Sequence, residues 1–307
     1  MRDSWRLTKN QDALHTRARM IYAIRDFLIN RDYLEVETPS IIPSPIPEPH
    51  IDAISCGDRF LHTSPELYMK QLLAAGYPKI FQICKCFRAG ERGSFHLPEF
   101  TMLEWYCRGM DYRLLMKECE DLIFSIVHNL GYGDVIHYQG RTLSFKKPWE
   151  TLSVREAFSC YAPMQMDEAV NKGLFDEIMV CHIEPHLGSA QPTFIYDYPV
   201  SEATLAKAKE KEPGIAERFE LYMGGIEIAN ACSELTDMEE HHVRIEKVQE
   251  YRYSMNKARY PVSDCFLQDI ADMPMAAGIA LGVDRLAMIF SDVSVIDDVV
   301  AFIPELG

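Results

Sequence analysis

The segment FRAGERGSFHLPEFTMLEWY, residues 87–106, constrains the fold more than any other part of the chain. It contains the end of one run with strand-like alternation, IFQICKCFR, and most of a second, EFTMLEWYC, joined by a short polar loop. Because side chains alternate across a strand, one face of the second run carries Phe100, Met102, Glu104 and Tyr106. An aromatic ring and a carboxylate–phenol pair on one face can stack a base and hold an ammonium group, and Arg88 beside the loop can grip a phosphate. The segment predicts a β-hairpin that binds a nucleoside triphosphate next to a cationic small molecule.

The remaining periodicity predicts helices between strands that pair by hairpins. Helices are expected at about residues 9–31, 64–76, 111–130 and 237–258, and strands at 193–199 and in a hairpin turning at Gly224-Gly225. The run GIALGVDRLAMIF reads as a strand leading into a helix. This order predicts an α+β fold, an antiparallel sheet flanked by helices, in a single domain over residues 1–307. Residues 133–190 hold a strand-like piece, RTLSF, and one or two helices, and could form a small insertion.

A proline-rich stretch follows the first predicted helix. The prolines at 39, 43, 45, 47 and 49 exclude a helix there and predict a stiff, extended loop. Such a loop is either a connector or a lid beside a site.

Charge and cysteine content limit the partners and the compartment. The net charge is −15, from 31 basic and 46 acidic residues, which disfavours tRNA as the main partner and suits a basic protein partner. The nine cysteines include no CxxC pair, so neither a zinc site nor a disulfide framework is indicated. No apolar run reaches the ~20 residues of a membrane span and no signal core is present, so a cytoplasmic protein without membrane contact is expected.

Four motifs resemble those of a known family. HLPEFTMLEWY, SPELYMK, GIALGVDRLAM and FLINRDYLEVETP are similar to segments of class II lysyl-tRNA synthetases and, more closely, of their paralogues, the elongation factor P (R)-β-lysine ligases. The resemblance covers nearly the whole chain and implies the class II synthetase catalytic fold. FLINRDYLEVETP resembles the motif that forms the dimer interface, so a homodimer is expected.

The resemblance also implies how ATP is held. Arg88 would bind the α-phosphate and His96 the γ-phosphate, Phe100 would stack on adenine, and Arg285 would cover the other face of adenine and meet the γ-phosphate. In the hairpin loop Arg92 is a further potential phosphate partner. The family has Glu at the place of Gly90, where it contacts the adenine amino group, so a one-residue shift of the loop would give that contact to Glu91.

Further residues are implied for the amino acid and the metal. Glu104, Tyr106 and Glu234 would surround the substrate's side-chain amine, Glu66 would bind its amino group and Asn230 its carboxylate end. Glu220 and Glu227 match the magnesium-binding glutamates. Strict alternation along a strand puts Glu227 and Asn230 on opposite faces. If both have the roles that the resemblance implies, the strand must contain a bulge between them.

Small residues form the last part of the predicted pocket. Gly278, Ala280 and Gly282 share one strand face, where they let a ligand approach the backbone. Lysyl-tRNA synthetases generally have Gly at the place of Ala280, so the extra methyl indicates a substrate other than ordinary α-lysine.

Together these features predict a ligase. It would use ATP and Mg²⁺ to activate lysine or (R)-β-lysine as an aminoacyl-adenylate, and would transfer it to a lysine side chain of elongation factor P. The first motif begins near Phe27, which leaves no room for an anticodon-binding domain of ~100 residues. One alternative is a stand-alone amino-acid:AMP ligase with another acceptor. A non-catalytic, synthetase-like regulatory subunit is the other; Gly90 favours it, while the presence of Arg88, Arg285, Glu220 and Glu227 argues against it.

Overall fold

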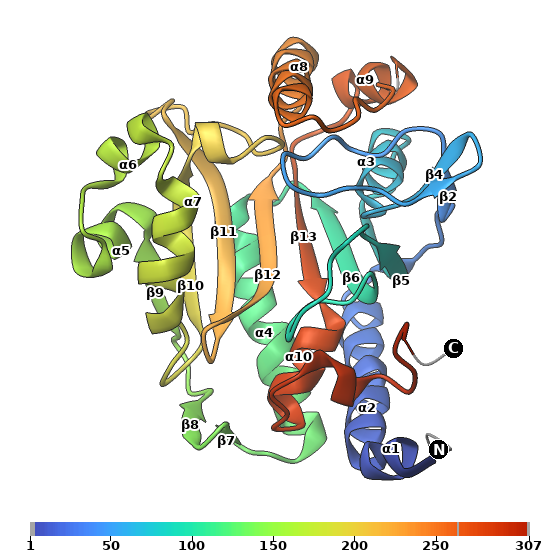
Figure 1. Cartoon of the computed structure of the whole chain (residues 1–307), viewed down its shortest axis with the longest axis vertical. Helices are drawn as coiled ribbons and strands as arrows, with labels where there is room; N and C mark the ends of the chain where they lie inside the picture. Colours follow the sequence, from blue (N-terminus) through green and yellow to red (C-terminus); the bar gives the residue numbers. More distant parts are fainter. Residues whose placement is uncertain (1–3, 263, 306–307) are drawn as a thin grey trace.

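The computed structural model describes residues 4–262 and 264–305 and is built on an eight-stranded sheet (Figure 1). In sheet order the strands are β1 (Leu34–Glu35), β5 (Lys79–Phe87), β6 (Glu99–Arg108), β13 (Ala276–Gly282), β12 (Ile226–Ser233), β11 (Ile215–Met223), β10 (Thr193–Pro199) and β9 (Glu150–Ser153). The α+β class is confirmed, and β5 and β6 form the predicted hairpin.

The sheet is antiparallel in its centre but not at its two edges. The six strands from β5 to β10 pair antiparallel, whereas β1 pairs parallel with β5 and β9 pairs parallel with β10. Parallel neighbours need a long crossover connection, and each of these two connections contains helices. The prediction of an antiparallel sheet therefore holds for the part that hairpins connect.

One face of the sheet is covered by three helices. These are α2 (Gln11–Ile29), α4 (Tyr112–Leu130) and α10 (Val283–Phe290), and α1 (Ser4–Lys9) precedes them. The largest hydrophobic core lies between them and the sheet, and from β6 it takes Leu103, Trp105 and Cys107. Residues of the other parity on β6 consequently point to the opposite face, as the sequence predicts.

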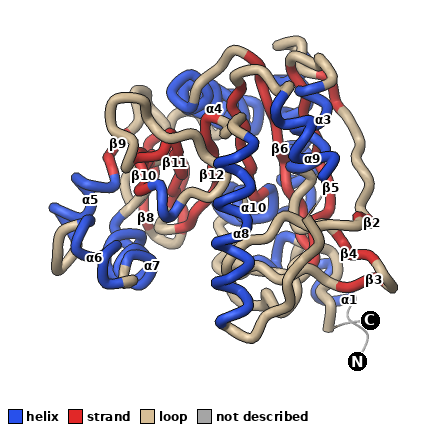
Figure 2. The backbone as a smooth tube through the Cα atoms, turned by 90° about the horizontal axis from the view of Figure 1, so that it is seen from above, coloured by secondary structure: helices blue, strands red, loops and turns tan. Residues whose placement is uncertain are grey.

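The opposite face is only partly covered. There α3 (Glu66–Ala74), α8 (Met238–Ser254) and α9 (Asp264–Ala271) lie together at one end, while the helices of residues 154–178 stand apart at the β9–β10 edge (Figure 2). The helix α3 begins as predicted, because Ser64 Oγ accepts a hydrogen bond of 3.0 Å from the backbone N–H of Glu66.

Residues 133–190 are more helical than expected. They form the hairpin β7 (Val135–Tyr138) and β8 (Arg141–Ser144), the edge strand β9, and then α5 (Val154–Tyr161), α6 (Met166–Lys172), α7 (Phe175–Ile178), a π-helical turn η1 (Met179–Ile183) and a 3-10 turn η2 (Glu184–His186). The predicted strand RTLSF is β8. A separate hydrophobic cluster, in which Phe158 and Phe175 stack at 5.3 Å, joins these helices to β10 and β11. The segment therefore belongs to the sheet, because β9 pairs with β10 and the helices pack against β10 and β11.

The β11–β12 hairpin turns where the sequence predicts. Gly224 and Gly225 have φ values of 61° and 79°, which a two-residue turn matching the strand twist requires. The two glycines are needed because other residues adopt this backbone region at a cost.

The proline-rich segment is extended and fixed in place. Around it β2 (Ile41–Ile42), β3 (Ser55–Cys56) and β4 (Arg59–Leu61) form a three-stranded sheet, and no helix forms between residues 43 and 54. Arg252 of α8 is 1% exposed, and its guanidinium donates to Glu48 O at 2.7 Å, Ile51 O at 2.8 Å and Asp52 Oδ1 at 2.8 Å. These bonds hold the segment against α8.

Two 3-10 turns complete the fold, η3 (Val200–Glu202) and η4 (Ile296–Val299). Within the described ranges, no helix combines the length and the apolar composition that a bilayer span would need.

Candidate active site

A cavity of about 780 Å³ lies on the sheet face opposite α2 and α4. It brings together the residues that the sequence predicts for the site, with the exception of Arg92: Glu66, Arg88, Glu91, His96, Phe100, Glu104, Tyr106, Glu220, Glu227, Asn230, Glu234, Ala280, Gly282 and Arg285. Their individual roles stay predictions, but their convergence from four separate stretches of chain (66, 88–106, 220–234 and 280–285) is a property of the fold.

Strand register places four of these residues in one row across the sheet. Glu104 pairs with Ala280, Ala280 with Asn230, and Asn230 with Glu220. Neighbouring strands are ~4.8 Å apart, so the row spans ~14 Å. Two carboxylates therefore lie at the ends of a row whose centre is a methyl group and an amide.

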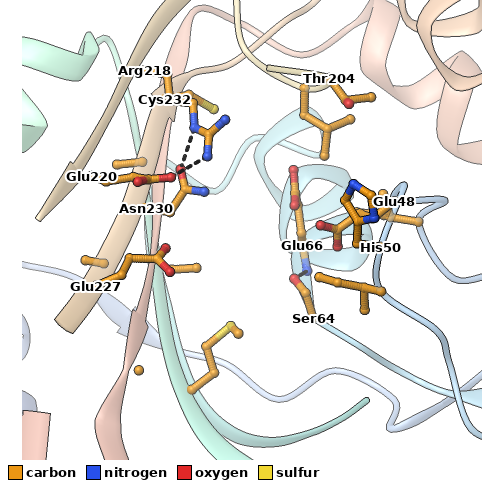
Figure 3. A pocket seen from close by; sticks show the side chains of 18 of the residues that line it. Glu48, His50, Ser64, Glu66, Thr204, Arg218, Glu220, Glu227, Asn230 and Cys232 are labelled. Carbon is orange, nitrogen blue, oxygen red and sulfur yellow. Dashed lines mark hydrogen bonds and ion pairs between the residues drawn. The ribbon is translucent and has the colours of Figure 1, made fainter. Parts of the chain in front are cut away.

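The predicted bulge is present in β12. Leu221 pairs with Ala229 but Tyr222 pairs with Glu227, which leaves Ile228 as an extra residue on that strand. The extra residue reverses the face of everything beyond it, so Glu227 and Asn230 both face the cavity (Figure 3).

One end of the cavity is built around Glu104. This carboxylate is 1% exposed and accepts hydrogen bonds from Ser64 Oγ at 2.6 Å and Tyr106 OH at 2.8 Å. Burial, reinforced by the charge of Glu66, raises the pKa of Glu104 to about 8. Gly278 is required beside it, because a Cβ there would overlap the Tyr106 ring and Glu234 Oε1.

Lys70, which the sequence does not single out, lies buried behind this end of the cavity, between two of the carboxylates that line it. Its side chain is fully buried, its Nζ lies 2.7 Å from Glu234 Oε2, and it is also ion-paired with Glu66. Burial raises the pKa of Glu234 to about 7 against the lowering effect of Lys70. The i, i+4 spacing from Glu66 within SPELYMK was the available signal.

The other end of the cavity begins at Arg88. Its guanidinium lies 5.0 Å from the centre of the Phe100 ring and 3.8 Å from Glu91 Oε1, and its buried Nε has no hydrogen-bond partner among the described residues. Gly90, at φ 75°, turns the loop so that Glu91 lines the cavity, which is the shift that the sequence suggests. An orphaned donor next to an aromatic face fits a phosphate beside a stacked base.

Arg285 contacts Glu227 and His96, two other residues that are predicted to bind ATP. Its Nη1 donates to Glu227 Oε2 at 3.1 Å, and its Nη2 lies 2.6 Å from His96 Nε2. Since a guanidinium only donates, His96 Nε2 accepts, and burial together with Arg285 lowers the pKa of His96. Arg92, in contrast, is not among the residues that line the cavity; it pairs with Asp297 at 2.8 Å and Glu305 at 2.6 Å, and its role as a phosphate partner stays a prediction.

Glu220 and Glu227 offer oxygen ligands for a hard cation. Glu220 Oε2 accepts from Tyr198 OH at 2.6 Å and Tyr222 OH at 2.9 Å, and burial raises the pKa of Glu220 while Arg218 lowers it. Burial and the charges of Glu220 and Glu227 also raise the pKa of Glu184, to about 7. Carboxylate oxygens are the hard ligands that Mg²⁺ prefers, so Glu220 and Glu227 fit this metal.

Arg218 is a second residue that the sequence analysis missed. Its Nη2 donates to Glu220 Oε1 at 2.5 Å and its Nε to Asn230 Oδ1 at 3.2 Å (Figure 3). It shares the strand face of Glu220 at i, i+2, which was the signal for it.

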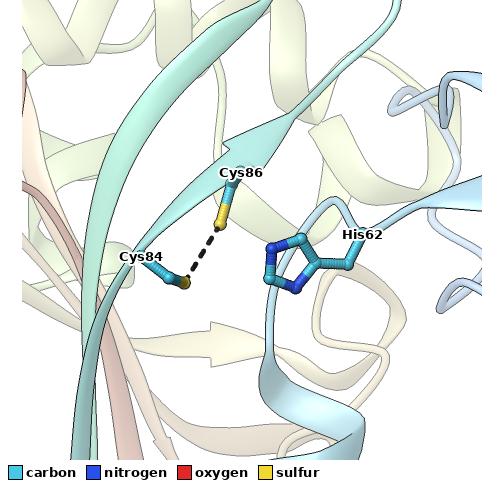
Figure 4. Close-up of side chains that lie close together, drawn as sticks. All are labelled: His62, Cys84 and Cys86. Atoms are coloured by element: carbon cyan, nitrogen blue, oxygen red, sulfur yellow. Dashed lines mark hydrogen bonds between the residues drawn. The ribbon is translucent and has the colours of Figure 1, made fainter. Parts of the chain in front are cut away.

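A histidine and two thiols lie next to the ATP end. Cys84 and Cys86 share one face of β5 with sulfurs 3.9 Å apart, and His62 approaches them (Figure 4). His62 Nε2 donates to Lys85 O at 2.6 Å, so Nδ1, which is buried and has no hydrogen-bond partner among the described residues, carries the free lone pair of the neutral ring. A hydrogen bond from Cys86 lowers the pKa of Cys84 to about 6. The described cysteines are all free thiols.

Comparison with known proteins agrees with this geometry. The family model for class II tRNA synthetases (D, K and N) matches residues 2–305. Elongation factor P–(R)-beta-lysine ligases from Buchnera aphidicola and Proteus mirabilis are each 35% identical, over 98% and 97% of both chains respectively. The lysine–tRNA ligase of Burkholderia ambifaria is also 35% identical, over 96% of this chain and 64% of that ligase.

Proposed function

The chain belongs to the class II tRNA synthetases of the D, K and N type, and we propose that it activates lysine or (R)-β-lysine with ATP and transfers it to a lysine side chain of elongation factor P. The relatives that match over nearly their whole length carry the name of that ligase. The chain is thus an enzyme of the amide-forming ligase class.

The observation that carries the proposal is the division of the cavity into two chemically different ends. Phe100 and Arg88 define one end, and Glu104 with Tyr106 defines the other, four residues or ~13 Å further along β6. Adenine and the phosphates suit the first end, and an ammonium group suits the second. A lysine-like amino acid laid between them would bring its carboxylate toward the α-phosphate.

The first half-reaction then needs no side-chain nucleophile. An oxygen of the amino acid's carboxylate attacks the α-phosphorus, the bond to the bridging oxygen of pyrophosphate breaks, and an aminoacyl-adenylate forms. Arg88 and Arg285 would orient the triphosphate and stabilise the charge that builds up on it. Glu220 and Glu227 would hold Mg²⁺, which supplies further neutralisation of the phosphates when bound.

Ala280 supports a substrate other than α-lysine. Its methyl group lies in the row between Glu104 and Asn230, the predicted partners of the substrate's amine and carboxylate ends. The methyl removes space beside the substrate backbone. An amino group displaced by one carbon is the simplest way to fit such a pocket.

We further propose a homodimer that works in the cytoplasm, where ATP and the acceptor are available. The first motif and the residues that flank it leave a group of large apolar side chains exposed, namely Tyr22, Ile29, Leu34 and Ile41, which are between 46% and 72% exposed. Such a group along α2, β1 and β2 suits a partner surface. Sedimentation equilibrium tests this: a single species of monomer mass at micromolar concentration would contradict it.

ATP–pyrophosphate exchange tests the activation step. We expect exchange with (R)-β-lysine and, more weakly, with L-lysine, and none without an amino acid. Absence of exchange with both would refute the lysine assignment. Arg88→Ala should reduce exchange at least a hundredfold if it binds the α-phosphate. A mass increase on elongation factor P, localised to one lysine, then tests the acceptor.

A further inference from the structure

Glu48 stands in the middle of the proline-rich segment that covers the cavity. Pro47 and Pro49 flank it and restrict its backbone, and Arg252 Nη1 binds its carbonyl oxygen at 2.7 Å. The side chain lines the cavity from the cover, while Glu220 and Asn230 line it from the sheet (Figure 3). The fold therefore presents a carboxylate at a fixed place opposite the sheet.

Glu48 differs from the other carboxylates of the cavity in having no partner. Among the described residues no hydrogen bond or ion pair is made by its side chain, whereas each of the other nine has at least one. These nine are Glu66, Glu91, Glu104, Asp176, Glu202, Glu220, Glu227, Glu234 and Asp284. A preorganised carboxylate without an internal cation is a site for a cation from outside.

The position of Glu48 indicates which cation this is. Its strongest charged neighbour is Arg88, followed by Glu66, Glu91 and Arg218, and burial raises its pKa. Glu48 and Arg88, the predicted α-phosphate ligand, line the same cavity, in which the activated carbonyl of an adenylate would lie. The residues predicted to bind the ammonium groups of the amino acid belong to α3 and to the sheet. A second ammonium group that enters beside the proline-rich segment would therefore meet Glu48.

We propose that Glu48 binds the ammonium group of the acceptor lysine and takes its proton in the second half-reaction. This inference rests on the proposed function and adds a residue to it. The acceptor enters as –NH₃⁺, and a lysine amine of ordinary pKa ~10.4 is almost wholly protonated at neutral pH, so attack requires a base.

The proton and bond changes balance without any other reactant. The ammonium group gives one proton to the Glu48 carboxylate, and the free amine attacks the carbonyl carbon of the adenylate. A C–N bond forms, and the bond between that carbon and the phosphate oxygen breaks with its electron pair, releasing AMP. The second N–H proton leaves to solvent as the amide forms, and Glu48 later returns its proton to solvent.

Measuring the two half-reactions separately tests this role, because a base for the acceptor lysine acts in the transfer step and not in the activation step. Glu48→Gln keeps the shape of the side chain and removes its basicity, and Glu202→Gln is the matched control on another carboxylate of the lining. We expect Glu48→Gln to keep ATP–pyrophosphate exchange within about twofold and to lower single-turnover transfer to elongation factor P by at least ~100-fold. Glu202→Gln should leave both within about twofold. Hydroxylamine, an amine already unprotonated at neutral pH, should trap the adenylate equally fast on wild type and Glu48→Gln.

The pH dependence of transfer gives a readout that a structural defect would not reproduce. In Glu48→Gln only acceptor that is already deprotonated can attack, so transfer should rise about tenfold per pH unit between pH 7 and 9. The ratio of the wild-type transfer rate to that of Glu48→Gln should decrease over the same pH range. The charged and titratable groups around Glu48, which are Glu66, Glu91, Arg88, Arg218 and His50 (Figure 3), are the same in both proteins.

Three results would overturn the inference. Transfer by Glu48→Gln at the wild-type rate would remove Glu48 from the step. A tenfold higher KM for the amino acid in exchange, with transfer unchanged, would place Glu48 on the amino acid instead. Wild-type enzyme that neither exchanges nor transfers would overturn the proposed function itself, and this inference with it.

Discussion

Lys70 Nζ lies 2.7 Å from Glu234 Oε2, and the same ammonium group is paired with Glu66, so one buried cation joins the two carboxylates that the family resemblance assigns to the substrate's amines. Before substrate binds, Lys70 is the only described cation in contact with either of them. Lys70 thereby holds the two carboxylates in position before the substrate binds.

Replacing Lys70 should therefore cost stability. In Lys70→Met the buried carboxylate of Glu234 and the partly exposed one of Glu66 lose their cation, and we expect the free energy of unfolding to fall by about 3 kcal/mol near neutral pH. Urea denaturation measures this change. The control is Lys172→Met, which removes an i, i+4 pair with Glu168 whose side chains are 53% and 51% exposed. That change should be a few tenths of a kcal/mol; equal effects would show that Lys70 has no special position.

Gly278 should tolerate no side chain. A Cβ there overlaps Tyr106 and Glu234, whereas at Gly282 the nearest atom is Arg285 Cδ at 3.5 Å, an ordinary contact. We expect Gly278→Ala to lower the free energy of unfolding by about 1–3 kcal/mol and to abolish amino-acid activation, because the Glu104–Tyr106 hydrogen bond is displaced. Gly282→Ala should retain wild-type stability. Thermal unfolding of the two variants is the measurement, and a stable Gly278→Ala would contradict the packing described.

The buried carboxylate of Glu104 should make the free enzyme less stable as pH rises. Its folded pKa of about 8 is above the ordinary value of 4.5, so between these pH values the folded state holds a proton that the unfolded state has lost. Stability from this group is thus full below pH 4.5 and is lost as pH rises toward 8, by up to about 1.4 kcal/mol per pH unit. Urea denaturation at pH 6, 7 and 8 should show a smaller decline in Glu104→Gln than in wild type.

The same group predicts the opposite trend in activity. A substrate ammonium group binds the ionised carboxylate, so kcat/KM for the amino acid in exchange should rise from pH 6 and level off near pH 8. Glu104→Gln should lower kcat/KM and flatten the profile. A profile that is unchanged in this variant would remove Glu104 from amine recognition.

Cys84 should be the most reactive of the half-buried and buried thiols. A hydrogen bond from Cys86 lowers its pKa to about 6, whereas burial raises the pKa of Cys119. Iodoacetamide at pH 7 should modify Cys84 faster than Cys119, with a rate midpoint near pH 6, as measured by peptide mass spectrometry. Cys86→Ala, which removes the donor, is expected to slow the reaction at pH 6 and 7. ATP should protect Cys84, since Cys84 pairs with Met102 on the strand that carries Phe100.

Much of this site was predictable from local pattern. Parity on β6 predicts that Phe100, Glu104 and Tyr106 share a face, and the cavity contains all three. The glycine pair at 224–225 predicts the hairpin, and the clash between parity and family resemblance predicts the bulge in β12. In each case the information lies within a few residues of chain.

What escaped prediction depends on contacts between distant segments. Lys70 is an ordinary helix lysine until β12 brings Glu234 to it, and nothing near Arg92 in the sequence reveals that it pairs with Asp297 and Glu305. The parallel edge strands and the extra helices of residues 154–178 reflect crossover connections, whose pairing no local period reveals. Glu48 was also missed, because its lack of a partner is visible only when its neighbours are known.

The extra residue Ile228 has a consequence for how this enzyme can change. On its two sides the side chains of β12 alternate with opposite parity. Glu227, a predicted metal and ATP ligand, and Asn230, a predicted amino-acid ligand, therefore both face the cavity. Losing one residue at the bulge would turn Glu227 away while Asn230 kept its place. With the roles proposed for Glu227 and Asn230, a change on one side of Ile228 would alter the handling of ATP and a change on the other side the choice of amino acid, each independently of the other.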